Sequence, residues 1–399
     1  MKNKYDFIIV GSGIIGLAIA RSIKKHKPGS TVLILEKEKD IAQHASGRNS
    51  GVLHAGFYYT ADSLKAKFMV EGNKSMKEYC REKGLKINAC GKLVVATNEQ
   101  EFEQLYELER RGKKNGANIR LIEEAEAFEI EPNVKTFKKA LYSPDTATVD
   151  PREVCASLRK DLEKGGVEFQ FDTKYIGKSQ DAMVTTKGPF RAQKVINCGG
   201  LHADKIAQDF GFGKKYTMMP FKGLYLEYLK NTTDVKTNIY PVPNLNNPFL
   251  GVHFTKTVSG KIKIGPTATP ALWRENYNGL SRFEPFEFLE ISYFDCRLLA
   301  SNSFGFRDLA REEMKKHNKH YFIELAMALV KNIDPSGFGE FLAAGIRAQL
   351  LDKKTLKLVQ DFIIEGDAHS THVLNAVSPA FTCAFPFAEY VISNFVLKS

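Results

Sequence analysis

The first 36 residues alternate between apolar runs and a helical pattern. Residues 5–10 form a mostly apolar run typical of a buried strand, residues 17–25 have helical periodicity, and residues 31–35 predict a second strand. A G-x-G-x-x-G turn at residues 11–16 joins the first strand to the helix, and Glu36 follows Gly16 by 20 residues. This order of elements predicts a nucleotide-binding βαβ unit.

The glycines and the acid have separate roles in such a unit. Gly11 and Gly13 allow a tight turn and a close approach to a pyrophosphate, which lies at the positive N-terminus of the helix. Gly16 allows the helix to pack closely on the strand. Glu36 is placed to accept hydrogen bonds from ribose hydroxyls, and its charge disfavours a 2′-phosphate.

The rest of the chain predicts a mixed α/β protein. Helices are expected at residues 99–112, 151–164, 312–331 and 385–397, and strands at residues 167–171, 194–198, 218–229, 249–255, 261–264 and 359–364. Nucleotide-type elements bracket two β-rich insertions. We therefore predict a discontinuous Rossmann-like domain made of residues 1–80, 140–215 and 335–399, and a β-rich second domain made of residues 81–139 and 216–334.

Composition and charge narrow the class of protein. Apolar residues make up 43% and charged residues 26% of the 399 residues, which excludes a disordered, collagen-like or coiled-coil chain. The sequence has no run of about 18 apolar residues that would span a membrane. The N-terminal apolar run is too short for a signal peptide, so we expect a cytoplasmic protein. The six cysteines have no C-x-x-C or zinc spacing and are expected to be reduced, buried thiols.

The formal net charge of +11 suits an anionic partner. A nucleic acid, an anionic membrane surface and an anionic small substrate all meet this condition. The sequence has no nucleic-acid-binding motif and its lysines are scattered, so no nucleic acid is expected. Peripheral contact with the inner face of the cell membrane stays open. The segment at residues 385–397 has few basic residues and is expected to be a closing helix and not a membrane-surface helix.

A polar, glycine-rich segment at residues 43–59 is too long for a plain connector and offers small residues and donors that suit a flavin ring. The glycine-rich start and this segment resemble the FAD-dependent L-2-hydroxyglutarate dehydrogenase/oxidase family within the D-amino-acid-oxidase-like flavoproteins. The similarity continues, in order, at residues 63–66, 149–151, 195–204, 220–223, 240–243, 248–255, 265–266, 274–277, 345–349 and 375–379.

Some positions depart from the family pattern. Lys222 and Leu224 stand where the family has Arg and Glu, Val377 replaces a proline, and residues 281–330 match poorly. Lysine does not reproduce the bidentate contact of arginine, so the departure at Lys222 concerns the identity of the substrate.

The resemblance implies that FAD is bound by the first domain and that the second, β-rich domain binds the substrate. FAD would take a hydride from C2 of L-2-hydroxyglutarate, or a close 2-hydroxy diacid, to give the 2-oxo acid. No metal is expected. The residues expected to bind FAD are Gly11, Gly13, Ile14, Ile15, Gly16, Glu36, Lys37, Ser46, Arg48, Asn49, Ser50, Gly51, Cys198, Gly199, Gly200, Ser378 and Pro379.

The reaction requires a cation for the C1 carboxylate and a base for the hydroxyl proton. Arg347 is the candidate cation, because its planar guanidinium matches a carboxylate. His54 is the first candidate base and His253 the second. Each histidine has the alternative role of a core or flavin-contact residue, and covalent attachment of FAD to His44 or His54 is a further alternative.

The other substrate contacts and the partners are less defined by the sequence. Arg48 and Lys222 are candidates for the distal carboxylate, and Tyr59 and Tyr240 for the pocket wall. The sequence does not reveal the electron acceptor, which is expected to be a quinone or oxygen. Two rival functions stay open: an FAD-dependent amino-acid or amine oxidase of the same superfamily, and a nucleotide-binding RNA-modifying or regulatory protein.

Overall fold

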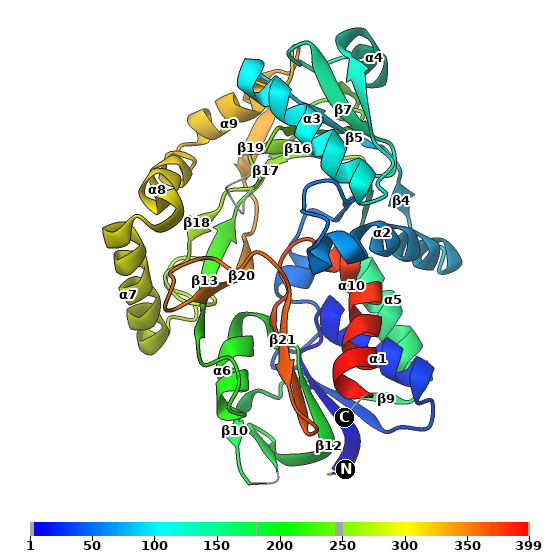
Figure 1. Ribbon diagram of the computed structural model, residues 1–399, viewed down its shortest axis with the longest axis vertical. Coiled ribbons are helices and arrows are strands. Elements are labelled where there is room, and N and C mark those ends of the chain that lie inside the picture. Colours follow the sequence, from blue (N-terminus) through cyan, green and yellow to red (C-terminus); the bar gives the residue numbers. More distant parts are fainter. Residues whose placement is uncertain (1–3, 181, 244–249, 398–399) are drawn as a thin grey trace.

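The computed structural model describes residues 4–180, 182–243 and 250–397 and contains two large β-sheets (Figure 1). The first sheet has the order β10-β11-β12-β1-β2-β9, and β22 pairs with β12 and with β21. β22, β12, β1, β2 and β9 run parallel, as expected for a Rossmann-like sheet. The strands are β1 (Lys4–Val10), β2 (Val32–Leu35), β9 (Val167–Gln170), β10 (Tyr175–Lys178), β11 (Met183–Thr185), β12 (Gly188–Asn197), β21 (Ile363–Gly366) and β22 (Ser370–Asn375).

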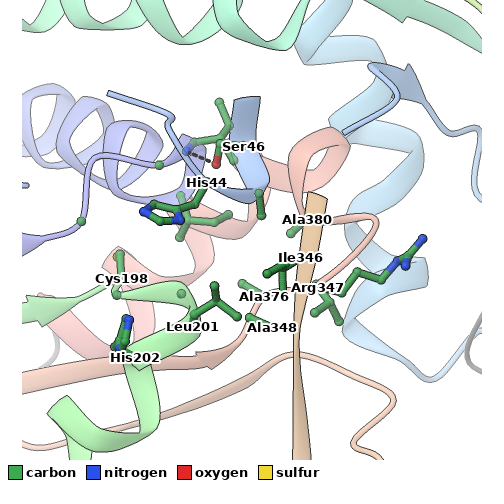
Figure 2. A pocket seen from close by; sticks show the side chains of 18 of the residues that line it. His44, Ser46, Cys198, Leu201, His202, Ile346, Arg347, Ala348, Ala376 and Ala380 are labelled. Carbon is green, nitrogen blue, oxygen red and sulfur yellow. Dashed lines mark hydrogen bonds between the residues drawn. The ribbon is translucent and has the colours of Figure 1, made fainter. Parts of the chain in front are cut away.

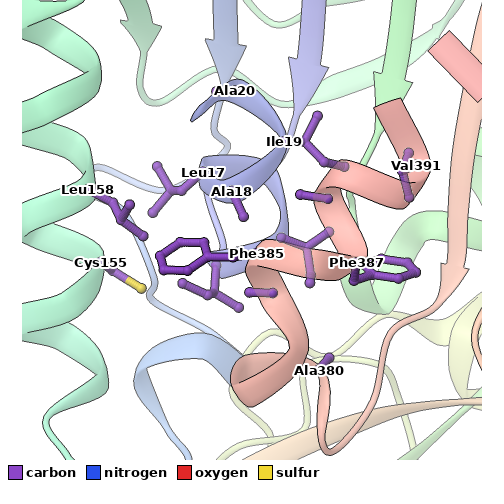
Figure 3. Packing of buried hydrophobic residues seen from close by; sticks show 14 of the residues in the cluster. Leu17, Ala18, Ile19, Ala20, Cys155, Leu158, Ala380, Phe385, Phe387 and Val391 are labelled. Carbon is purple, nitrogen blue, oxygen red and sulfur yellow. The ribbon is translucent and has the colours of Figure 1, made fainter. Parts of the chain in front are cut away.

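Three helices form the apolar layer against this sheet: α1 (Ile14–His26), α5 (Pro151–Lys164) and α10 (Ala380–Val391). Figure 3 shows Leu17 of α1 near Leu158 of α5 and Phe385 of α10, and Ile19 on the side of α1 toward Val391 of α10. Most of α1 is buried, because all of its first ten residues except the exposed Arg21 are apolar or small, and the other basic residues lie in its last turn. α2 (Leu64–Glu82) packs beside α10.

The second large sheet has the order β19-β14-β17-β16-β15-β5-β7-β6. Its strands alternate between two faces. Leu93, Ile239 and Phe254 join an apolar cluster that includes Phe322 of α9, whereas Lys92 lies on the opposite face. The strands are β5 (Lys92–Val95), β6 (Arg120–Glu123), β7 (Lys139–Ser143), β14 (Leu226–Tyr228), β15 (Asn238–Pro241), β16 (His253–Lys256), β17 (Ile262–Gly265) and β19 (Phe338–Phe341).

Two three-stranded sheets complete the architecture: β18 (Thr269–Pro270), β13 (Tyr216–Gly223) and β20 (Gly345–Asp352) form one, and β3 (Val52–Leu53), β8 (Ala147–Val149) and β4 (Ile87–Asn88) the other. The remaining α-helices are α3 (Glu99–Lys114), α4 (Glu124–Ile130), α6 (Ala203–Asp209), α7 (Pro285–Ser301), α8 (Phe306–Lys315) and α9 (Lys319–Met327). α7, α8 and α9 lie in sequence along one flank of the molecule (Figure 1). No helix in the described ranges is long and apolar enough to cross a membrane.

The structure confirms the α/β fold class and most of the predicted elements, with differences in the second half of the chain. The helix predicted at residues 312–331 is two helices, because the side chain of Asn318 accepts hydrogen bonds from two backbone amides and starts α9. The predicted strand at residues 218–229 is interrupted after Gly223, and the one at 359–364 begins only at Ile363. The closing helix begins five residues earlier than predicted, at Ala380. Residue 249 lies outside the described residues.

The cysteine and domain predictions have different outcomes. All six cysteines are free thiols, but only Cys80, Cys155 and Cys383 are buried as predicted. Cys90 and Cys198 are partly buried and Cys296 is exposed. The domain boundaries stay a prediction. Strand pairing places β7 and β19 in the second sheet, although their residues fall largely within ranges assigned to the first domain.

Candidate active site

A cavity of about 450 Å³ lies at the carboxyl ends of β1, β2 and β12. Val10, Leu35 and Cys198 line it where these strands end, and Arg347 of β20 lines its other side. Figure 2 shows Cys198 and His202 on one side of the cavity and Arg347 beyond Ile346 on the other. The position and size are those of ligand sites in doubly wound α/β folds.

Three backbone segments meet at the glycine-rich turn. A Cβ atom on Gly11, which has φ +104°, would lie 2.5 Å from the carbonyl oxygen of Cys198, and one on Gly16 would lie 2.0 Å from that of Gly11. The hydroxyl of Ser46 accepts a hydrogen bond of 2.9 Å from the amide of Ile14 in the first turn of α1. These contacts place the positive end of α1 at the cavity wall, where it suits a pyrophosphate.

Glu36 occupies the end of β2 and is almost fully buried. Its carboxylate accepts hydrogen bonds from the amide of Ser12 at 2.9 Å, the hydroxyl of Ser12 at 2.6 Å and the amide of Glu38 at 3.0 Å. These donors hold the carboxylate at the cavity wall, in the place that a ribose-binding acid takes in this type of fold.

An ion-pair network closes the cavity beside Glu36. Lys37 pairs with Glu38 and Glu275, and Arg282 donates to the same two carboxylates at 2.6 Å. The hydrogen bond from Arg282 holds the pKa of Glu38 well below its usual range. Glu38, Glu275 and His44 lie close enough to share a metal ion, but both carboxylates are already neutralised by Lys37 and Arg282, and we assign no metal to them.

The predicted cofactor residues are brought together by the fold. All of them line this cavity except Gly16, which contacts the Gly11 backbone, and Gly51, whose Cα lies against the carbonyl of Val149. The glycine turn, the helix N-terminus and the buried acid match the pyrophosphate and ribose of a dinucleotide, so the residues present fit FAD. His44, the alternative attachment residue, hydrogen-bonds Tyr277 and Glu38 at 2.7 and 3.0 Å.

Arg347 and His54 are the two predicted catalytic residues that line the cavity. The guanidinium of Arg347 donates a hydrogen bond of 2.9 Å to the carbonyl of Thr267, which fixes its orientation. His54 is held through its backbone: its amide donates to the hydroxyl of Thr382 at 3.2 Å, and its carbonyl accepts from Asn73 at 3.1 Å. Burial, and then the charge of Lys92, hold the pKa of His54 well below the usual range, so its ring is neutral at neutral pH.

His253, the second candidate base, lies outside the cavity lining. Its Nδ1 is 2.8 Å from the carbonyl of Gly251, and its ring stacks on Tyr240 with 3.7 Å between ring centroids. Burial lowers its pKa to about 3. Of the two candidate bases, His54 lines the cavity and His253 packs against Tyr240 outside it.

Of the other predicted substrate contacts, Tyr59, Lys222 and Tyr240 lie outside the cavity lining. The Tyr59 hydroxyl donates to the carbonyl of Ser378 at 3.3 Å, and the Lys222 amine donates to Asn276 at 3.1 Å. Neither these residues nor Tyr240 line the cavity. Arg48 lines it, but its guanidinium donates to the carbonyl of Gln43 at 2.8 Å and lies 4.3 Å over the Tyr277 ring.

Several lining residues were missed by the sequence analysis. Two of them are Tyr225, in the interruption between β13 and β14, and Ile346, beside Arg347 on β20. Their place in the cavity depends on the pairing of β13 with β20, which forms only in the folded chain. Glu275 reaches the cavity from the segment after β18, 239 residues beyond Glu36. No local spacing in the sequence signals these positions, although the match at residues 274–277 contained Glu275.

The fold and the site together define a flavin-dependent oxidoreductase. The family model described as FAD dependent oxidoreductase (DAO) matches residues 6–393, and the chain belongs to this family. FAD is therefore the cofactor of the site. The fold is similar to that of an FAD-bound L-alpha-glycerophosphate oxidase from Mycoplasma pneumoniae (TM-score 0.74, 24% identity, 99% of this chain and 96% of that chain).

The sequence relatives are more specific. The chain is 36% identical to the mitochondrial L-2-hydroxyglutarate dehydrogenase of Homo sapiens, over 98% of this chain and 88% of the relative. It is 32% identical to the L-2-hydroxyglutarate dehydrogenase of Escherichia coli strain K12, over 98% and 93%. The family resemblance found in the sequence is thereby confirmed.

The glycine turn gives a direct prediction for FAD binding. In Gly16→Ala, the new Cβ meets the Gly11 carbonyl, so α1 must move away from the turn that holds the pyrophosphate. We expect the purified variant to lose most of its FAD, measured as the ratio of absorbance at the flavin band to that at 280 nm. Gly29→Ala is the control, because a Cβ there has nothing within 4 Å. Normal FAD content in Gly16→Ala would contradict the assignment.

Proposed function

We propose that this enzyme oxidises the CH–OH group of L-2-hydroxyglutarate, or a close 2-hydroxy diacid, to the 2-oxo acid. Relatives that carry this name align with almost the whole chain. The observation that supports it most strongly is that Arg347 and His54 line the same cavity as the glycine turn. One wall can then hold the cofactor while a cation and a neutral base face the substrate.

Arg347 is suited to hold the C1 carboxylate. Its side chain lines the cavity and is largely withdrawn from solvent, and its hydrogen bond to the carbonyl of Thr267 holds the guanidinium in place there. A planar guanidinium can form two parallel hydrogen bonds with a carboxylate, and such charge-assisted bonds fix the substrate in one orientation.

His54 is suited to take the proton of the substrate hydroxyl. Its low pKa keeps the imidazole unprotonated at neutral pH, as a general base requires. FAD, when bound, accepts the hydride that leaves C2, so the C–H bond breaks as the C2=O bond forms. The carboxylate contact of Arg347 and the base then act on opposite ends of the same C1–C2 unit.

The electron acceptor and the location are part of the proposal. We propose a quinone or oxygen as acceptor, and a cytoplasmic enzyme in peripheral contact with the inner face of the membrane. Phe286, Leu289 and Tyr293 of α7 support this contact, since they lie on one helix face and are 79, 62 and 58% exposed. The net charge of +11 suits an anionic lipid surface, and flotation with anionic vesicles tests the contact.

The function is tested by anaerobic bleaching of the flavin with a panel of 2-hydroxy and 2-amino acids. We expect L-2-hydroxyglutarate to reduce the flavin faster than its D-enantiomer or any amino acid. Faster reduction by an amino acid or amine would instead indicate the amino-acid oxidase function of the same superfamily. Reoxidation of the reduced enzyme by oxygen or by a soluble quinone then identifies the acceptor.

Arg347→Ala should weaken substrate binding. Loss of a buried carboxylate contact costs about 2–5 kcal/mol, and each 1.4 kcal/mol corresponds to one decade, so KM should rise at least about tenfold. Arg347→Lys should recover only part of this, because an ammonium restores the charge without the planar fork. Steady-state kinetics measure the effect, with FAD content and Tm in parallel. Unchanged kinetics in the alanine variant would exclude this role.

His54→Ala should slow the chemical step while FAD stays bound. Loss of a general base typically lowers kcat by about 10²–10⁴. The measurement is the anaerobic rate of flavin reduction in a stopped-flow instrument, with His253→Ala as the comparison. If His54→Ala reduced its flavin at the wild-type rate and His253→Ala did not, the base would have to be reassigned to His253.

A further inference from the structure

Lys92 is a buried lysine next to the site, and no carboxylate among the described residues forms an ion pair with it. It begins β5, is 0% exposed, and its Nζ atom has no hydrogen-bond partner in the part of the chain that the structure describes. The Nζ atom lies 4.6 Å from the ring centres of Phe57 and Tyr58 and 4.7 Å from that of Tyr240. Three aromatic rings stabilise an ammonium in part, but its hydrogen-bonding capacity stays unused.

Two further polar atoms near Lys92 are also buried without a hydrogen-bond partner among the described residues. The Nδ1 atom of His54 and the hydroxyl of Tyr58 are buried and, within the described ranges, form no hydrogen bond. Tyr58 contacts Lys92 directly, and His54 lies four residues earlier on the same loop. The charge of Lys92 also acts on His54. A buried water typically makes about three hydrogen bonds, which is the number of unpaired atoms here. In His253, by contrast, the carbonyl of Gly251 already occupies Nδ1.

We propose that Lys92 is a positioning residue that decides which nitrogen of His54 carries the proton, acting through one bridging water. This inference rests on the proposed role of His54 as the base. As a neutral amine, Lys92 accepts a hydrogen bond from the water, and the water accepts one from the protonated Nδ1 of His54. The Nε2 atom then carries no proton and can take the proton of the substrate hydroxyl. As an ammonium, Lys92 donates toward Nδ1, and the neutral ring then carries its proton on Nε2 and cannot act as a base.

The surroundings allow Lys92 to change its protonation state near neutral pH. Burial lowers the pKa of Lys92 to about 7, and no carboxylate contributes to this shift. The titratable groups around the pair are Tyr58 on the same loop as His54, Tyr240 on β15 and His253 on β16, and the charges of Arg347 and Lys316 act on His253. Tyr58 and Tyr240 have pKa values raised by burial and stay neutral, so Lys92 is the group that titrates.

The protonation of Lys92 sets the direction in which kcat/KM changes with pH. As pH falls through about 7, Lys92 becomes an ammonium and the productive form of His54 is lost. The kcat/KM of the wild type should therefore decline on the acidic side of about pH 7. The carboxylates of a hydroxy acid ionise well below this range, so the substrate does not produce the same decline.

The test compares pH profiles of flavin reduction for the wild type, Lys92→Met and Lys92→Arg. Methionine cannot titrate, so the acidic decline should move to lower pH by at least about one pH unit. Arginine stays charged at every accessible pH and should lock the unproductive form. At pH 8 we therefore expect Lys92→Arg to be at least about tenfold slower than Lys92→Met.

The control is Lys65→Met, which removes another buried lysine, with Nζ 5.2 Å from the Tyr59 ring. Its pH profile should match the wild type. Tm and FAD content of each variant report on folding, and if Lys92→Arg does not fold, the profile of Lys92→Met alone decides. An acidic decline that stays near pH 7 in Lys92→Met would overturn the proposal. The proposal would also be overturned if Lys92→Arg were more active than Lys92→Met and the two variants differed only in KM. That result would make Lys92 an anion-binding residue.

The failure of this inference can be told from failure of the proposed function. If His54→Ala reduces its flavin as fast as the wild type, the base assignment fails and Lys92 has no partner to position. If His54→Ala is slow while Lys92→Met keeps the wild-type pH profile, only the role of Lys92 is excluded.

Discussion

The close approach of three backbone segments at Gly11, Gly16 and Cys198 is the constraint on which the rest of this site depends. With 2.0 Å and 2.5 Å between ideal Cβ positions and carbonyl oxygens, none of these contacts leaves room for a side chain on either glycine. The close contact fixes the start of α1 against the end of β1 and beside the end of β12. The helix N-terminus, Glu36 and the Cys198 turn consequently face one cavity. A bulkier residue in this turn would move the N-terminus of α1 away from Glu36, and a dinucleotide needs both groups at the same cavity.

A buried ion pair holds the segment after β18 in place beside the cavity. Arg274 and Asp204 are both fully buried, and the guanidinium of Arg274 donates to the two carboxylate oxygens of Asp204 at 2.5 and 2.9 Å. Breaking such a pair leaves an uncompensated charge and typically costs about 3–5 kcal/mol. The pair fixes the segment after β18 on α6, and the neighbouring Glu275 is thereby placed beside Lys37 and Arg282.

The sequence predicts those parts of the site whose information is local. The spacing from Gly11 to Glu36 describes one continuous βαβ unit, so its residues could be assigned together, and the cavity contains them as expected. Asn318 also carried a local signal, a helix N-cap, which overall helical composition obscured. The choice between His54 and His253 could not be made in this way. Both lie beside small residues in the sequence, and only the pairing of β16 with β15 places His253 against Tyr240.

Long-range strand register also explains why Lys222 and Tyr240, which were predicted to contact the substrate, do not line the cavity. Lys222 and Tyr240 belong to strands, where successive side chains point to opposite faces, so a shift of one position reverses their direction. Gly223, the neighbour of Lys222, lines the cavity, whereas the amine of Lys222 reaches Asn276. The register of β13 with β20, in which Phe221 lies opposite Arg347, is set by long-range pairing.

Charge in the interior of the site restricts the ligand. The main electrostatic influences on His253 come from Lys92, Arg347 and Lys316, and those on His54 from Lys92 and His253. Glu313, the acid that acts on Arg347, is itself paired with Lys316. The guanidinium of Arg347 therefore favours an anionic ligand in the cavity that it lines. A substrate with two carboxylates meets that requirement better than an amino acid, whose ammonium would add to the repulsion. The electrostatics therefore favour a hydroxy diacid over the amino-acid substrates that the shared fold also accommodates.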